Sequence, residues 1–163
     1  LMNMAGISTE DRKVAVKALE RAKETGGPAA ALELEDGRII TGKTTNLLGA
    51  SAALLLNVLK DLAGLDHSLH IISPESIEPI QKLKVDYLKS RNPRLHTDEV
   101  LIALSASAAN NPQARLALSQ LPKLDGCQAH TSVMLSDVDI KIFKKLGVQL
   151  TCEAVYEHEH LYH

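Results

Sequence analysis

The stretch Asp36-Gly37-Arg38-Ile39-Ile40-Thr41-Gly42-Lys43-Thr44 decides how this chain begins to fold. It matches the phosphate-loop pattern G-x-x-x-x-G-K-[ST], in which backbone N–H groups curl around a phosphate. However, the residues between its two glycines are mostly β-branched, and such residues prefer an extended backbone. Asp36-Gly37 is also a strong signal for a two-residue hairpin turn. We therefore predict a β-hairpin with arms at residues 30–35 and 38–43, rather than a nucleotide-binding loop.

The composition indicates one globular domain and argues against several classes of partner. Of the 163 residues, 45% are hydrophobic and 23% are charged, which is ordinary for a soluble domain with a substantial core. The net charge of −2 favours neither nucleic acid nor an anionic membrane surface. Aromatic residues make up only 2% of the chain, so we expect no base-stacking platform for single-stranded nucleic acid.

Cysteine content and hydropathy indicate the compartment. Cys127 and Cys152 are the two cysteines, and they provide neither a disulfide framework nor four metal ligands. Reduced thiols are typical of the cytoplasm. The longest apolar run, residues 47–56, is interrupted by polar and small residues and is too short to span a bilayer. We therefore expect a cytoplasmic protein with no membrane partner and no metal or other cofactor.

Helix-capping and turn signals place the remaining elements. The first helix is expected to start at Ser8-Thr9-Glu10-Asp11 and to end before Gly26. The second is expected to be capped by Thr44, Thr45 or Asn46, and because its side chains are apolar nearly all round it should be the central, buried helix. Four further helices are expected near residues 74–89, 97–109, 112–121 and 136–146, with three further strands at 69–72, 128–135 and 148–154.

The resulting order, α-β-β-α-β-α-α-α-β-α-β, predicts a single α/β domain over residues 1–163 with a tail at 155–163. Strand-helix-strand units favour parallel pairing, while the opening hairpin must be antiparallel. We therefore predict a mixed five-stranded sheet with helices on both faces. This order resembles that of the cytidine deaminase fold. The stretches that would carry the deaminase zinc ligands, residues 48–52 and 74–78, contain none of them, so the chain is not expected to be a zinc deaminase.

The chain also resembles the C-terminal portion of an uncharacterised bacterial family, domain of unknown function family 1846. The matching motifs include Ile72-Ser73-Pro74-Glu75 and Leu150-Thr151-Cys152-Glu153. Together with stretches 34–44, 47–53, 80–84 and 91–101, they cover nearly the whole chain. The resemblance implies a longer protein with an N-terminal module that is not part of this sequence. Some family members carry loose labels such as ATP-dependent peptidase, but the resemblance assigns no catalytic residue.

The junction between the hairpin and the second helix is the first candidate ligand site. Lys43, Thr44, Thr45 and Asn46 could bind an anion with the free N–H groups and the dipole of a helix N-terminus. Ordinary helix capping with a solvated lysine explains the same residues equally well. Ser73 starts the third helix, and we expect that start to lie near the first junction, although capping alone is the simpler interpretation.

A second candidate is the polar connector Arg91-Asn92-Pro93-Arg94-Leu95-His96-Thr97-Asp98-Glu99. Arg91 and Arg94, with a rigid proline between them, suit phosphate or carboxylate binding. His96 could serve as an acid or base near neutral pH. The alternative is a connector in which the arginines pair with neighbouring acidic residues and a threonine caps the next helix.

The remaining nucleophile and metal candidates are weaker. Cys127 and His130 lie three apart on an extended segment, so their side chains should point to opposite faces and form no dyad. His130 and Ser132 share a face and could line a pocket, although a structural cross-strand pair is the better explanation. The terminal histidines, at 158, 160 and 163, are not expected to form a native metal site.

From these features we predict a domain that binds a small phosphate- or carboxylate-bearing ligand, or that completes a cleft with the N-terminal module. The alternatives are an ATP-linked hydrolase whose phosphate site uses Lys43 and Arg94, and a structural assembly domain. No complete catalytic constellation is present in the sequence. A homo-oligomer is expected.

Overall fold

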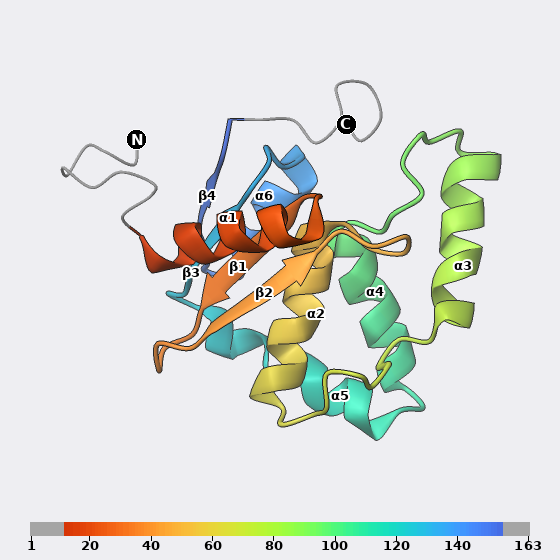
Figure 1. Cartoon of the computed structure of the whole chain (residues 1–163). Coiled ribbons are helices and arrows are strands. Elements are labelled where there is room, and N and C mark those ends of the chain that lie inside the picture. Colours follow the sequence, from red (N-terminus) through yellow and green to blue (C-terminus); the bar gives the residue numbers. More distant parts are fainter. Residues whose placement is uncertain (1–11, 155–163) are drawn as a thin grey trace.

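The computed structural model describes residues 12–154, which form one layered α/β unit (Figure 1). The elements, in chain order, are α1 (Lys13–Thr25), β1 (Ala29–Glu33), β2 (Ile39–Lys43), α2 (Ala50–Leu62), α3 (Pro74–Lys82) with a π-helical extension (Leu83–Tyr87), α4 (Thr97–Ala108), α5 (Pro112–Leu118), a 3-10 turn (Leu121–Leu124), β3 (Gln128–Thr131), α6 (Asp137–Lys145) and β4 (Gln149–Cys152). The predicted first-helix start and the 155–163 tail lie outside the described residues.

The predicted hairpin is confirmed. Strands β1 and β2 pair antiparallel from Ala29 opposite Lys43 to Glu33 opposite Ile39. The turn holds three residues rather than the predicted two, because Leu34 N donates to Arg38 O at 2.8 Å. Gly37 takes the left-handed conformation that such a turn requires at its last position, with φ of 90°. The stretch from Gly37 to Gly42 is therefore turn and strand, not a phosphate loop.

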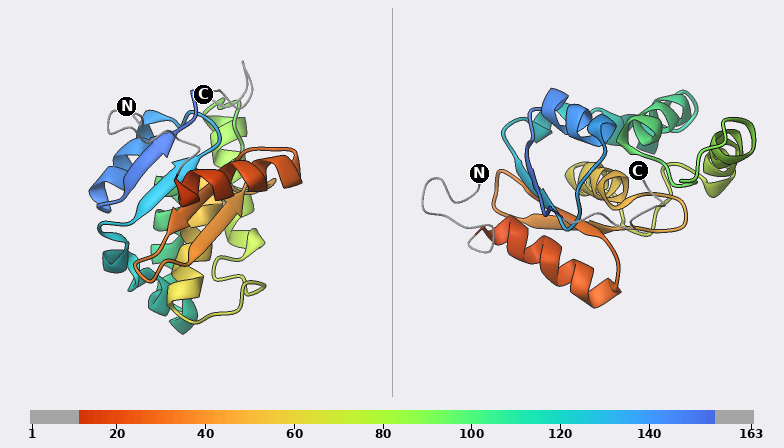
Figure 2. Two further views of the ribbon diagram at one scale, coloured as in Figure 1. Left: turned by 60° about the vertical axis from the view of Figure 1, so that its left-hand side comes forward. Right: turned by 90° about the horizontal axis from the view of Figure 1, so that it is seen from above.

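The sheet has the strand order β2-β1-β3-β4. Strand β1 pairs antiparallel with β3, and β3 pairs parallel with β4 through the crossover helix α6. Helix α1 covers one face of the sheet, while α2 lies on the other with the remaining helices beyond it (Figure 2). The prediction of a mixed sheet with helices on both faces is thus confirmed.

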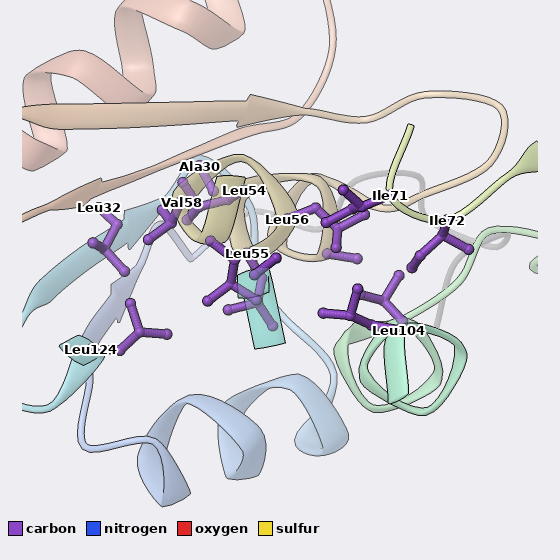
Figure 3. Close-up of a cluster of buried hydrophobic side chains, with 14 of the residues drawn as sticks. Ala30, Leu32, Leu54, Leu55, Leu56, Val58, Ile71, Ile72, Leu104 and Leu124 are labelled. Carbon is purple, nitrogen blue, oxygen red and sulfur yellow. The ribbon is translucent and has the colours of Figure 1, made fainter. Parts of the chain in front are cut away.

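Helix α2 is the central helix, as its apolar circumference predicts. Ten of its thirteen residues are buried, and Leu54, Leu55 and Val58 pack among side chains from the sheet and the outer helices (Figure 3). The close approach of β2 to this helix depends on Gly42, because a Cβ added there would overlap the backbone N and Cα of Leu54. The second glycine of the apparent phosphate loop therefore serves packing.

The predicted five-strand count is wrong, because residues 69–72 form no strand and the sheet in the part of the chain described has four. Instead the ammonium of Lys60, on α2, donates to the carbonyls of His67 and Leu69 at 2.8 and 3.3 Å. Ile71 and Ile72 then bury their side chains in the core. A short apolar run is equally compatible with a strand and with a buried extended segment. The cytidine-deaminase-like element order is therefore not borne out.

No helix within residues 12–154 is both long and apolar enough to cross a membrane.

Candidate functional site

The loops that follow β2, β3 and β4 gather at one end of the sheet. Ala29, at the start of β1, pairs with Lys43 at the end of β2, and Thr131, at the end of β3, pairs with Cys152 at the end of β4. Strands β2, β3 and β4 therefore all end at the edge where β1 begins. We call this end, with loop residues 44–49, 91–96 and 132–136, the carboxyl edge. Ligands of open α/β sheets usually bind at such an edge.

Two of the sequence-predicted segments meet at the carboxyl edge. Leu95 N donates to Leu47 O at 2.9 Å, and Gly49 N donates to Leu95 O at 3.2 Å. Arg94 Nε donates to Thr45 O at 2.6 Å. The segment that contains Lys43, Thr44, Thr45 and Asn46 is thus joined to the segment that contains Arg91, Arg94 and His96. These segments are about fifty residues apart in the sequence. The hydrogen bonds join residues 43–49 and 91–96 into one continuous border, which we call the rim.

The predicted capping of α2 by Thr44, Thr45 or Asn46 is wrong. Helix α2 begins at Ala50 with Gly49 as its N-cap. Thr45 Oγ1 instead accepts hydrogen bonds from Leu47 N and Leu48 N at 3.2 and 3.0 Å, so it closes a separate turn. A hydroxyl followed by an apolar run predicts a cap, but here the loop first pairs with residue 95 before the helix starts.

Three helix N-termini converge on the buried carboxylate of Asp139. Thr97, the first residue of α4, donates to Oδ1 from both its N–H (2.9 Å) and its hydroxyl (2.6 Å). Ser51, in the first turn of α2, donates to Oδ2 at 3.2 Å. His96, the N-cap of α4, places Nδ1 3.5 Å from the same oxygen. Asp139 itself lies in the first turn of α6, so its charge offsets the positive ends of three helices.

The protonation equilibria of Asp139 and His96 are coupled. Burial would raise the pKa of Asp139, but hydrogen bonds from His96 and Thr97 outweigh it and hold the pKa below its usual value. The hydrogen bond to Asp139 raises the pKa of His96, and burial opposes this only in part. The pair therefore favours a carboxylate beside an imidazolium.

A groove of about 540 Å³ opens beside the rim, between the 41–48 segment, the outer face of α2 and residues 67–77. Its cationic lining side chains are Arg21, Lys43 and Lys60, joined by His67 and His70, and no carboxylate of residues 12–154 lines it. Lys60 is held by main-chain carbonyls, and its burial lowers its pKa. The floor is apolar, formed by Leu47, Leu48, Leu56, Leu69, Ile71, Ile72 and Ile77. We call this the basic groove.

Ser73 is not brought to the rim. Its hydroxyl lies 3.0 Å from that of Ser76, and it lines a separate cavity with Ser107 and Asn110, beyond the middle of α4. Helix α3 begins beside the end of α4 and runs back towards its start (Figure 1). Pro74, the first residue of α3, lines the basic groove together with Lys43 and Asn46, so the start of α3 shares that groove with the hairpin junction, while Ser73 itself lines the other cavity.

His130 and Ser132 have structural partners. His130 is fully buried, with Nδ1 2.6 Å from Thr151 Oγ1 on the neighbouring strand and Nε2 2.7 Å from Glu153 Oε2. Ser132 Oγ accepts from Ala29 N at 2.9 Å. Neither side chain lines a cavity found among the described residues. The cross-strand alternative is therefore the better description of these two residues.

The buried His130 and the half-buried His96 predict a stability maximum near neutral pH. Burial lowers the pKa of His130, so its contribution is present above the ordinary value of about 6.5 and is lost as pH falls through the lowered folded-state pKa. The raised pKa of His96 has the opposite sign: its contribution is complete below about 6.5 and is lost as pH rises through the folded-state value. Urea unfolding across this range should show the free energy of unfolding falling on both sides of the maximum.

His96→Gln should abolish the fall on the alkaline side only, and His130→Gln should reduce the fall on the acidic side only. Identical pH profiles for the wild type and both variants would contradict these assignments.

Several residues of the site escaped sequence reasoning. Asp139, Ser51 and Thr97 carry no local sequence signal beyond that of helix-start or helix-interior residues. Asn57 and Lys60 line the basic groove, and they are two polar residues, three apart, within the largely apolar helix α2. That spacing puts them on one helix face and was the available signal for a polar cavity.

Comparison with known proteins identifies relatives along the whole domain. Residues 10–162 match the family described as domain of unknown function DUF1846, C-terminal. A UPF0371 protein of Corynebacterium efficiens is 60% identical over 99% of this chain, which is 33% of that protein. A UPF0371 protein of Streptococcus uberis is 50% identical with the same coverage of both chains. The chain spans about a third of the length of the curated relatives it matches. It belongs to the DUF1846 family and corresponds to that family's C-terminal domain.

Proposed function

We propose that this domain binds a small anionic ligand in the basic groove, with the rest of the longer protein completing the cleft. The observation that carries the proposal is the charge of the groove. Arg21, Lys43 and Lys60 line it, and none of the carboxylates in the described part of the chain does, although the whole chain has a net charge of −2. Such a local excess of cations attracts anions even when the protein as a whole is acidic.

The shape and chemistry of the groove suit an amphipathic anion. Its apolar floor would contact a hydrocarbon or ring body, while Lys43 at the rim would bind a phosphate or carboxylate head. Few precisely placed polar groups on an apolar surface are typical of small-molecule sites. A charge-assisted hydrogen bond of this kind contributes about 1.5–3 kcal/mol.

The connector between α3 and α4 supports the rim. Arg94 donates to the carbonyl of Thr45, two residues after Lys43, so both cations lie on the same side of the domain. Asn92 Oδ1 accepts from Arg94 N at 3.0 Å and holds the connector's turn. Arg94 therefore positions the rim that carries Lys43.

Lys43→Ala tests the proposal. A thermal-shift screen with inorganic phosphate, ATP and decanoate should find a stabilising anion. Lys43→Ala should weaken its binding by about tenfold, as the loss of about 1.4 kcal/mol requires. Lys141→Ala removes an exposed lysine of α6 that lines none of the cavities found in residues 12–154, and it should bind like the wild type. Equal affinities for the wild type and Lys43→Ala would reject the site.

An ATP-linked hydrolase is the second candidate, and the His96–Asp139 pair is the observation in its favour. A buried carboxylate that holds one nitrogen of an imidazolium leaves the other N–H available as a general acid. His96 Nε2 lies 3.4 Å from Asn92 Nδ2 and beside a small cavity at the carboxyl edge. ATP hydrolysis that His96→Gln abolishes would favour this candidate, and binding of ATP without hydrolysis would favour the first.

A further inference from the structure

Beyond its first turn, helix α4 carries no charge. Residues 100–114 contain no Asp, Glu, Lys or Arg, in a chain with 23% charged residues. Part of this stretch is exposed: Ile102 has 67% of its surface open, and Ser105, Ala106 and Ala109 are exposed as well. Exposed helix faces of monomeric proteins normally carry charged residues. Depletion of charge is a property of the cores of protein interfaces.

A cavity of about 470 Å³ lies between this face and helix α3. Ile71, Ile80, Ile102, Ala103 and Ala106 form its apolar lining. Serines and asparagines surround them, and His70 is the one titratable side chain among the lining residues. This α3–α4 cavity is thus apolar at its centre and bordered by uncharged polar side chains. Protein-binding surfaces have the same arrangement.

Helix α3 and its π-helical extension pack weakly against the domain. Across residues 74–87 only Ile77 and Lys84 are buried. Leu83, Tyr87 and the following Leu88 are 48%, 67% and 67% exposed. In Figure 2 this segment lies at the margin of the domain, on the far side of α4 from the sheet. A helix this short is marginal without tertiary packing, so further structure is expected to support it.

The geometry points to this surface, from Ile80 and Tyr87 across the cavity to Ile102 and Ala106, as the docking site for the preceding part of the full-length protein. We call it the α3–α4 surface. The relatives contain about two thirds of their length beyond the matched region, and the match is to a C-terminal family domain. A covalently linked partner has a high effective concentration, so it occupies a neutral apolar surface ahead of a second copy. This inference does not depend on the ligand proposed for the basic groove.

Hydroxyl-radical footprinting of the full-length protein tests the docking site with an internal reference. Leu116, on α5, is 44% exposed and lies outside the α3–α4 surface. Ile102 is the more exposed of the two within residues 12–154, yet in the full-length protein it should be labelled severalfold less than Leu116. Labelling of Ile102 at or above the level of Leu116 would overturn the proposal. Protection of Ile102 from labelling that disappears when the protein is diluted would overturn the proposal too, because it would identify a second copy as the occupant.

A charge substitution provides the second measurement. In the full-length protein, Ile102→Lys should weaken the coupling between the two parts, seen as separation of a single calorimetric unfolding transition into two. Leu116→Lys, an equivalent change at an exposed apolar residue elsewhere, should leave the transition intact. The same calorimetric profile for both variants would contradict docking at the α3–α4 surface.

Discussion

Replacing Asp139 with alanine should destabilise the domain by about 3–5 kcal/mol, as expected when one partner of a buried ion pair is removed. The substitution leaves the His96 imidazolium without its counter-charge. It also leaves the N–H and hydroxyl of Thr97 and the hydroxyl of Ser51 without their acceptor. These groups belong to the first turns of α2 and α4, so the loss reaches well beyond α6. Urea unfolding followed by circular dichroism measures the effect.

Asp137→Ala is the matched control for Asp139→Ala. Asp137 lies in the same first turn of α6 but is exposed. Its loss removes only an interaction with the helix dipole, worth about 0.3–1 kcal/mol. Equal urea midpoints for the two variants would show that Asp139 does not join the helix starts.

Leu54→Asp is the second substitution with a large expected effect. Leu54 is fully buried in the core, and its backbone lies directly against Gly42 of β2. The aspartate would be an unpaired charge among apolar side chains, where neither water nor a cation can reach it. We expect a loss of several kcal/mol or failure to fold, because burying such a charge ranks among the most destabilising changes known.

Leu116→Asp provides the comparison for Leu54→Asp, because it makes the same chemical change at a side chain that is 44% exposed. It should remain within about 0.5 kcal/mol of the wild type, as surface substitutions usually do. A cooperative Leu54→Asp variant with an unchanged melting temperature would disprove the central role of α2.

Local signals predicted the parts of the fold that depend on neighbouring residues. Asp36-Gly37 located the hairpin, because a tight hairpin turn itself needs a residue such as glycine that readily takes the left-handed conformation. The apolar circumference of α2 predicted its burial, since a helix without a polar face must be covered on all sides. The segment at residues 69–72 was misassigned because the Lys60 side chain, and not a neighbouring strand, donates to the carbonyls of His67 and Leu69, and no local pattern reveals that contact.

The site was less predictable because its contacts span the sequence. Asp139 contacts Thr97 and Ser51 across sequence separations of 42 and 88 residues. Contacts over such separations produce no periodic pattern in the sequence from which they could be predicted. Lys43 and Arg94 were recognised as candidate ligands from their residue types. Their common location depends on the main-chain pairing of Leu47 and Leu95. That pairing uses backbone N–H and C=O groups, which are common to nearly all residues. The side chains at these positions therefore do not predict it, and only the tertiary fold determines it.

The basic groove and the α3–α4 surface differ in charge. The groove concentrates cations beside an apolar floor, while the α3–α4 surface has no Asp, Glu, Lys or Arg among its cavity-lining residues. Both include residues of the 70–77 segment, and Ile71 lines both cavities. We therefore expect the packing of the longer protein on the α3–α4 surface to set the position of one wall of the groove.

Backbone NMR of the ¹⁵N-labelled protein, titrated with the anion that gives the largest thermal stabilisation, tests the central claim most directly. We expect the largest amide shift changes at Lys43, Thr45 and Asn46, with smaller changes at Lys60 across the groove. Lys43→Ala should lose these changes at the same anion concentration. Largest changes outside the basic groove, or no changes with phosphate, ATP or decanoate, would contradict the assignment of this domain as an anion-binding one.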